Sequence, residues 1–212
     1  MKKIWLICLT FFALTVLVQS CSTVRVACIG NSITEGFGID SPAVYSYPAQ
    51  LQNIMGKGYS VRKFGLSART MLLKGDCPYM KEPAWQEAQA FKADVVIIKL
   101  GTNDSKPHNW QHGAEFRHDL EQMITTLLPN KPKIYLCTPI PAFKSTWDIN
   151  DSVIVNGIIP VQQEMAEKYG LHVIDLHTLY ANDGDKMLDD GIHPNAKGAR
   201  RLAEIISTYI KK

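Results

Sequence analysis

Short apolar segments alternate with longer stretches of helical periodicity through most of the chain. Five segments have the length and composition of strands, at residues 24–29, 59–64, 94–100, 133–137 and 172–175. The first is the kind of apolar run expected of a strand buried on both faces, and the third (DVVIIKL) is the strongest. Each of the first three ends at a glycine. These segments predict the strands of one sheet.

Helical spacing of apolar positions fills the gaps between the strands. The pattern predicts helices over residues 47–55, 83–91, 114–128, 151–169 and 196–210. Strand–helix alternation with short connections favours a parallel sheet covered by helices on both faces. Because crossovers are right-handed, we expect a three-layer, flavodoxin-like α/β fold with strand order 2-1-3-4-5. Reactive groups should then lie outside the carboxyl ends of strands 1 and 3.

The first 21 residues have the features of a targeting segment, so we expect residues 22–212 to form a single domain. Lys2 and Lys3 precede an apolar run over residues 4–18, which is short for a membrane span. Residues 17–21 resemble a bacterial lipoprotein processing box, in which Cys21 would be lipidated, although Gln19 is unusual there. Simple cleavage with release and an uncleaved anchor remain alternatives. All three place the protein outside the cytoplasm, in the cell envelope, the periplasm or the medium.

Composition excludes several classes of function. Charged residues make up 20% of the chain with a formal net charge of +3, and the basic residues are dispersed, so no nucleic-acid surface is expected. Five cysteines at irregular spacing do not form a disulfide framework or a metal motif. His108 and His112 are four residues apart, but no third ligand accompanies them, so we expect no metal and no cofactor. The oligomeric state is not encoded in any recognisable pattern.

Two polar motifs follow the central strands. After strand 1, Gly30-Asn31-Ser32 forms a turn that would present a serine hydroxyl, with backbone N–H groups facing a developing oxyanion. After strand 3, Asn103 can direct its amide toward the same point, and Asp104 can brace the loop. The Gly-x-Ser-x-Gly elbow of α/β-hydrolases is absent.

A third motif stands just before the last helix. Serine is a poor nucleophile at neutral pH and needs a neighbouring base, and histidine has a suitable pKa. Asp190, three residues before His193, can accept the Nδ1 proton and leave Nε2 facing the serine. The three motifs together predict a Ser32–His193–Asp190 triad at one edge of the sheet.

These motifs resemble those of the SGNH (GDSL-like) hydrolase superfamily over nearly the whole domain. Three blocks carry the resemblance: residues 30–32, residues 101–104, and residues 190–193. The resemblance implies an oxyanion hole made of the Ser32 N–H, the Asn103 side chain and a third N–H after strand 2. The family usually has a glycine at that third position, whereas the alignment of residues 63–70 puts Ala68 there, and Lys63 replaces the usual asparagine.

The expected reaction is hydrolysis of short acyl esters through an acyl-enzyme. The loops after strands 3 and 4 carry Trp110, Trp147 and His108, which we expect to bind a glycan or other small ester substrate. The resemblance extends to carbohydrate O-acetylesterases of the sialate and xylan types, so an O-acetyl carbohydrate is the expected substrate. A lysophospholipase or thioesterase of the same superfamily is the alternative, and a non-catalytic binding module would require loss of Ser32 or His193.

Overall fold

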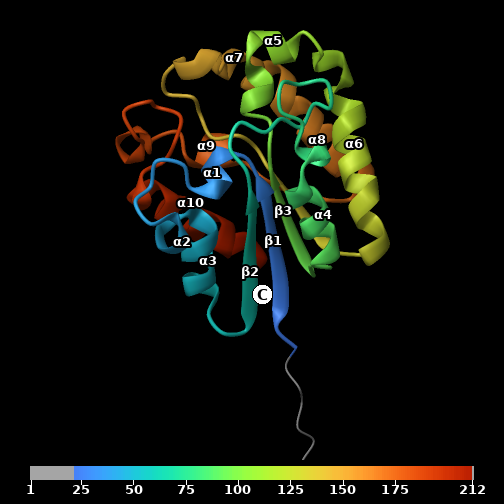
Figure 1. The fold of residues 1–212 in the computed structure, drawn as a ribbon, viewed down its shortest axis with the longest axis vertical. Helices are drawn as coiled ribbons and strands as arrows, with labels where there is room; N and C mark the ends of the chain where they lie inside the picture. Colours follow the sequence, from blue (N-terminus) through green and yellow to red (C-terminus); the bar gives the residue numbers. More distant parts are fainter. Residues whose placement is uncertain (1–21, 212) are drawn as a thin grey trace, which may run out of the picture.

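The computed structural model describes residues 22–211, so the targeting segment and Cys21 lie outside the described residues. Its core is a five-stranded parallel sheet with the order β2-β1-β3-β4-β5, which confirms the predicted topology (Figure 1). The strands are β1 (Val24–Gly30), β2 (Tyr59–Gly65), β3 (Val95–Lys99), β4 (Lys133–Cys137) and β5 (His172–Ile174).

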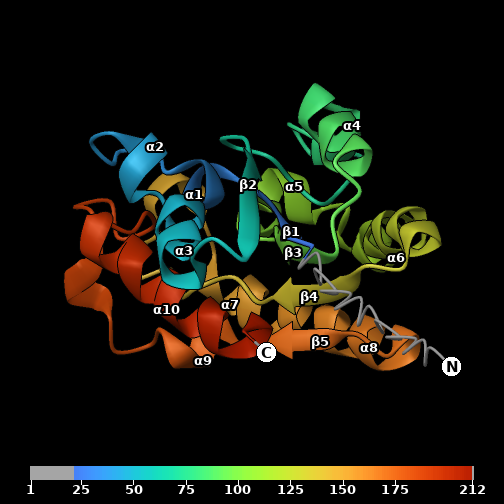
Figure 2. The same ribbon diagram turned by 90° about the horizontal axis from the view of Figure 1, so that it is seen from below.

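Helices cover both faces of the sheet and form the outer two layers. They are α1 (Ser32–Glu35), α2 (Pro42–Tyr45), α3 (Tyr47–Met55), α4 (Pro83–Ala90), α5 (Pro107–Trp110), α6 (Phe116–Leu127), α7 (Asp151–Val153), α8 (Ile159–Tyr169), α9 (Leu176–Leu179) and α10 (Ala196–Ile210). Figure 2 shows α3 and α10 on one side of the strands and α4, α6 and α8 on the other. Right-handed crossovers account for this arrangement.

Alternating side chains of each strand supply the two cores. On β1, Cys28 points to the α3/α10 face and Ile29 to the α4/α6/α8 face. On β3, Ile97 points to the α3/α10 face and Ile98 to the α4/α6/α8 face, and both are completely buried. Burying a strand on both faces requires apolar residues at successive positions, which explains the unbroken apolar runs in the sequence.

Two predicted helices differ from the observed elements. The segment 151–169 consists of α7 and α8 joined by a π-helical segment, Ile154–Ile158, because Pro160 has no N–H to continue the α-helical ladder. The segment 114–128 begins and ends in 3₁₀ turns around α6, with Pro129 in the last of them. Neither change alters the topology.

The register of the strands brings the sequence motifs to one edge. Gly30 at the end of β1 pairs with Gly65 of β2 on one side and with Lys99 of β3 on the other. A Cβ atom on Gly65 would lie 2.3 Å from the backbone nitrogen of Glu35, so glycine is required for α1 to pack against β2. The segments that follow these three strands therefore meet at the carboxyl edge of the sheet.

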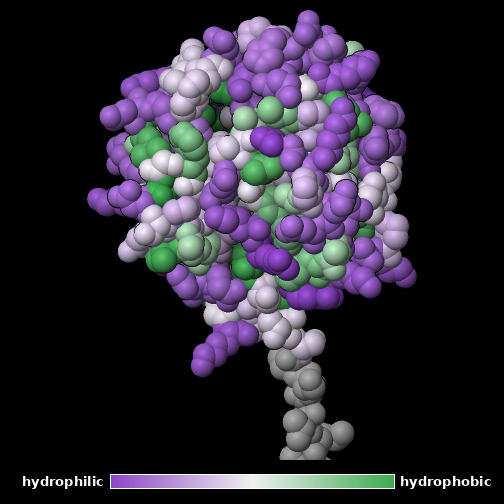
Figure 3. All heavy atoms as spheres, viewed as in Figure 1, coloured by the Kyte–Doolittle hydropathy of each residue, from purple (hydrophilic) through white to green (hydrophobic). Residues whose placement is uncertain are grey.

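The exterior is ordinary for a globular domain. On the face shown in Figure 3, hydrophilic residues cover most of the described surface, and apolar residues lie in small separate groups. Within residues 22–211, no helix has the length and hydrophobicity needed to cross a membrane.

Candidate active site

Ser32 is the first residue of α1, a single helical turn that begins directly after β1. The side chain of Asn31 caps this turn by accepting a hydrogen bond from the Ile33 N–H at 3.1 Å. Gly36 ends the turn in the left-handed region, with φ of 92°. The turn holds the Ser32 side chain at the sheet edge, where it is 8% exposed.

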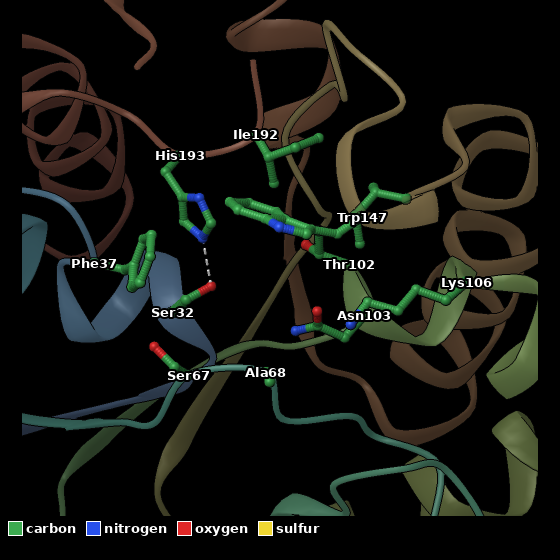
Figure 4. Close-up of a pocket in the computed structure, with 11 residues that line it drawn as sticks. Ser32, Phe37, Ser67, Ala68, Thr102, Asn103, Lys106, Trp147, Ile192 and His193 are labelled. Atoms are coloured by element: carbon green, nitrogen blue, oxygen red, sulfur yellow. Dashed lines mark hydrogen bonds between the residues drawn. The ribbon is translucent and has the colours of Figure 1, made fainter. Parts of the chain in front are cut away.

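His193 and Asp190 reach Ser32 from the loop that precedes α10. The Nε2 atom of His193 lies 2.7 Å from the Ser32 Oγ, and its Nδ1 atom lies 2.9 Å from the Asp190 Oδ2 (Figure 4). The other oxygen of Asp190 accepts the backbone N–H groups of Ile192 at 2.7 Å and His193 at 2.8 Å. The structure thus brings together the three predicted triad residues in a continuous chain of hydrogen bonds.

The electrostatics of this chain suit a general base. Burial raises the pKa of Asp190, but the hydrogen bonds from His193 and Ile192 outweigh that effect and hold its pKa below the usual value. Burial also lowers the pKa of His193 against the opposing influence of Asp190. The ring is therefore neutral at neutral pH, with Nδ1–H donating to Asp190 and Nε2 accepting from the serine hydroxyl.

Two further predicted residues face Ser32 from the neighbouring loops. Ala68 has φ of 65°, a left-handed conformation that few residues other than glycine adopt. The amide nitrogen of Asn103 donates to the Arg69 carbonyl at 3.1 Å, which joins the Asn103 side chain to the loop that carries Ala68. In Figure 4 this amide points toward the space between Ser32 and Ala68, where an oxyanion would form. The Ser32 N–H belongs to the first turn of α1, whose N–H groups have no partner within the helix.

Asp104 fixes the relative position of these two loops. Its completely buried carboxylate accepts the backbone N–H groups of Met71 at 3.1 Å and Leu72 at 2.8 Å. Burial raises the pKa of Asp104 to about 6 even though these hydrogen bonds oppose the shift. The sequence-based expectation that Asp104 braces the loop agrees with this geometry.

A cavity of about 240 Å³ opens above the triad. Aromatic rings flank His193 on both sides, with centroid distances of 4.7 Å to Phe37 and 5.2 Å to Trp147 (Figure 4). Trp147 is 50% exposed, so much of its surface is available to a substrate. The cavity is lined by Ser32, Phe37, Ser67, Ala68, Thr102, Asn103, Lys106, Trp147, Ile149, Ile192 and His193.

Two residues expected at the substrate site lie elsewhere. Trp110 packs against the apolar core beside Phe116, with Gly157 directly beneath its ring. A Cβ atom on Gly157 would lie 2.3 Å from that ring, so the tryptophan fills space between helices rather than facing solvent. His108 Nε2 contacts the Asp76 carboxylate at 3.1 Å, outside the cavity. Of the three predicted binding residues, only Trp147 lines the cavity.

Phe37 is a wall of the cavity that the sequence reasoning missed. It lies between Gly36 and Gly38 in the loop after α1, and an aromatic residue between two glycines so close to Ser32 was the available signal in the sequence. Among the described residues, no group of three or more His, Cys, Asp or Glu side chains is arranged to hold a metal ion. The three described cysteines, Cys28, Cys77 and Cys137, are free thiols.

Comparison with known proteins agrees with this geometry. Residues 28–201 match the model of the GDSL-like Lipase/Acylhydrolase family, and the chain belongs to this family. It is 63% identical to an acetylxylan esterase of Xylanibacter ruminicola, over 89% of this chain and 43% of that protein. It is 28% identical to a multidomain esterase of Ruminococcus flavefaciens, over 57% of this chain and 16% of that protein. The chain therefore spans less than half the length of these curated relatives.

Solved structures share the fold at low sequence identity. A carbohydrate acetylesterase from Sinorhizobium meliloti superposes with a TM-score of 0.73 at 21% identity, covering 89% of this chain and 98% of that one. An aryl esterase from M. smegmatis gives a TM-score of 0.74 at 20% identity, covering 89% and 99%. These similarities show that the chain shares its three-layer fold with these two proteins.

Proposed function

We propose that this protein is a serine esterase that removes acetyl groups from carbohydrates. The observation that carries this proposal is the hydrogen-bonded chain from Asp190 through His193 to Ser32, which opens directly into a small cavity. A neutral imidazole at 2.7 Å from a serine hydroxyl is arranged to remove its proton during attack on a carbonyl carbon. The family and the 63% identical acetylxylan esterase support the same reaction.

The reaction would proceed in two steps. His193 accepts the Ser32 proton as Oγ attacks the ester carbonyl, and Asp190 stabilises the imidazolium that forms. The N–H groups of Ser32 and Ala68 and the Asn103 amide would stabilise the oxyanion. His193 then protonates the leaving alcohol, and a water molecule activated by the same histidine hydrolyses the acyl-enzyme.

The size and walls of the cavity support a short acyl group. A volume of about 240 Å³ accommodates an acetyl group next to part of an alcohol, whereas a fatty acyl chain needs a long apolar groove. Trp147 and Phe37 stand at the entrance, where exposed aromatic faces are suited to stacking on sugar rings. The sugar itself would then be recognised mainly outside the cavity.

The test is release of acetate from a panel of acetylated oligosaccharides, including acetylated xylo-oligosaccharides, followed by mass spectrometry of the glycan. We expect a loss of one acetyl mass per turnover with the wild-type protein and none with Ser32→Ala. Octanoyl esters and lysophospholipids are the comparison substrates. A clear preference for these longer chains would contradict the proposed carbohydrate esterase and indicate a lysophospholipase. A preference for acyl thioesters would indicate a thioesterase.

We also propose that the protein is exported and that Cys21 is its lipidated first residue after processing. The basic Lys2 and Lys3, the apolar run over residues 4–18 and the sequence up to Cys21 support this proposal. Lipidation would attach the domain to a membrane surface. Mass spectrometry of the mature N-terminus in the native host tests it: a diacylglyceryl cysteine is expected, and an unmodified N-terminal residue would contradict lipidation.

A further inference from the structure

Lys99, the last residue of β3, has a chemically unusual position. Its side chain is 1% exposed, and its Nζ atom has no hydrogen-bonding partner within residues 22–211. Lysine is among the residues least often buried, and a buried ammonium is normally paired with a carboxylate. A buried lysine without such a partner is costly, which points to a role in the site rather than in the stability of the fold.

The register of the sheet places Lys99 next to the catalytic turn. It pairs with Gly30 of β1, which is two residues before Ser32. Two residues after Lys99, Gly101 begins the loop that carries Asn103. Alternation along β3 puts the Lys99 side chain on the same face as Ile97, and this face is covered by α3 and α10. The amine therefore lies in the core beneath the elements that carry Ser32 and His193.

The groups around Lys99 provide no compensating charge at neutral pH, because the thiol that acts on the pKa of Lys99, Cys137, is then uncharged. Cys28 from β1 and Cys137 from β4 are completely buried thiols, and burial raises the pKa of each so far that both stay neutral. Tyr47 from α3 is a buried phenol whose pKa is also raised well above its usual value. Tyr180, which follows α9, is a further neutral phenol on this face. The residues that α10 buries are apolar, apart from one glycine and one serine.

The ionisable groups of the active site complete this environment. Burial lowers the pKa of Lys99 to about 8, so the amine still carries its charge in neutral and mildly acidic solution. That charge lowers the pKa of His193, in the same direction as burial and against the influence of Asp190. The histidine is thus subject to a carboxylate on one side of its ring and an uncompensated ammonium in the core below.

We propose that Lys99 is a positioning residue of the esterase, whose buried ammonium opposes protonation of His193 and keeps the catalytic base available in mildly acidic solution. This inference rests on the proposed function, because it assigns Lys99 an effect on the same Ser32–His193 pair. Above pH 8, where the amine loses its proton, its influence on the base fades. Lys99 does not contact the substrate, so its effect should appear in pH dependence rather than in substrate preference.

The test is the pH profile of kcat/KM for a small acetyl ester, measured on wild type and Lys99→Met. Methionine has a similar shape but no charge, so the pKa of His193 should rise. The acidic limb of the profile, where activity falls as His193 takes up a proton, should then move to higher pH. A shift of about half a pH unit or more is expected, which lowers activity about threefold at any pH on that limb. An acidic limb that stays in place in folded Lys99→Met protein would overturn the proposal.

Lys133→Met is the matched control. Lys133 begins the neighbouring strand β4 on the same face as Cys137, but at the opposite edge of the sheet from Ser32. This variant removes an equal charge and should leave the acidic limb where it is in wild type. Lys99→Arg keeps the charge, so the acidic limb of folded Lys99→Arg protein should stay at its wild-type position.

Thermal unfolding separates the electrostatic role from a structural one. Removing an unpaired buried charge should leave the melting temperature of Lys99→Met unchanged or higher, whereas a residue needed only for packing would lower it without moving the limb. NMR titration of the His193 ring, identified by its absence in His193→Asn, gives the same comparison without substrate. If the wild-type protein hydrolysed no ester, the proposed function would be wrong. The NMR titration would still show whether the charge of Lys99 lowers the pKa of His193.

Discussion

The two sides of the proposed active site hold their polar groups by different means. On the triad side, side chains are linked directly, with distances of 2.7 Å from His193 to Ser32 and 2.9 Å from His193 to Asp190. On the oxyanion side, the backbone does the positioning: Ala68 depends on a φ of 65°, and the buried Asp104 holds the loop that carries it. Substitutions should therefore act through side-chain chemistry on the first side and, apart from the Asn103 amide, through loop geometry on the second.

The largest effect is expected at the nucleophile. Ser32→Ala removes the oxygen atom that forms the acyl-enzyme in the proposed mechanism, so kcat should fall by about 10⁴-fold or more. The melting temperature should stay near the wild-type value, since the change removes one oxygen atom. Hydrolysis of a chromogenic acetyl ester by the purified, folded variant measures this, and activity within tenfold of wild type would remove Ser32 from the mechanism.

The next effect is expected on the oxyanion side, at its one side-chain donor. Asn103→Ala removes the amide and its hydrogen bond to the Arg69 carbonyl, so kcat should fall by about 10²- to 10³-fold with a smaller change in KM. Asn156→Ala, on an exposed residue of the π-helical segment, is the control and should change neither constant. A loss of less than fivefold at Asn103 would mean that this amide does not meet the oxyanion.

Two tryptophan substitutions test whether the cavity entrance between the two sides binds the sugar. Trp147→Ala should lower kcat/KM about tenfold on an acetylated oligosaccharide and little on a small acetyl ester, because the exposed ring would contact the sugar. Trp110→Ala should instead destabilise the fold by about 2 kcal/mol or more, because that ring packs in the core. Kinetics on both substrates and chemical denaturation measure the two effects, and equal losses of Trp147→Ala on both substrates would argue against sugar stacking.

The smallest effect is expected where a backbone group alone is required. Glycine adopts the left-handed conformation of residue 68 without strain, so Ala68→Gly should change kcat by less than about threefold. Ala68→Val is the matched variant, because a branched side chain strongly disfavours this conformation. It should lower kcat far more than glycine does, and similar activity in the two variants would show that the Ala68 backbone does not take part.

The contact between Ser32, His193 and Asp190 was predictable from sequence because each residue lies in a short motif with its own chemistry. Strand order followed from alternation and handedness, and together they located Ser32 and His193 at one edge. The cavity walls were harder to predict: Trp110 and Trp147 look alike in sequence, and only the packing of Trp110 against Gly157 and the core distinguishes the two. Lys99 was hidden within an apolar strand, since its environment depends on neighbours from three other parts of the chain.

Covalent labelling with a fluorophosphonate tests the central claim most directly. Attack by the Ser32 Oγ on phosphorus expels fluoride and leaves a stable adduct, which peptide mass spectrometry can assign to a residue. The account predicts one adduct per folded chain, located on Ser32, and no adduct when His193 is replaced by alanine. An adduct on another residue, or an unlabelled protein that still hydrolyses acetyl esters at the wild-type rate, would contradict it.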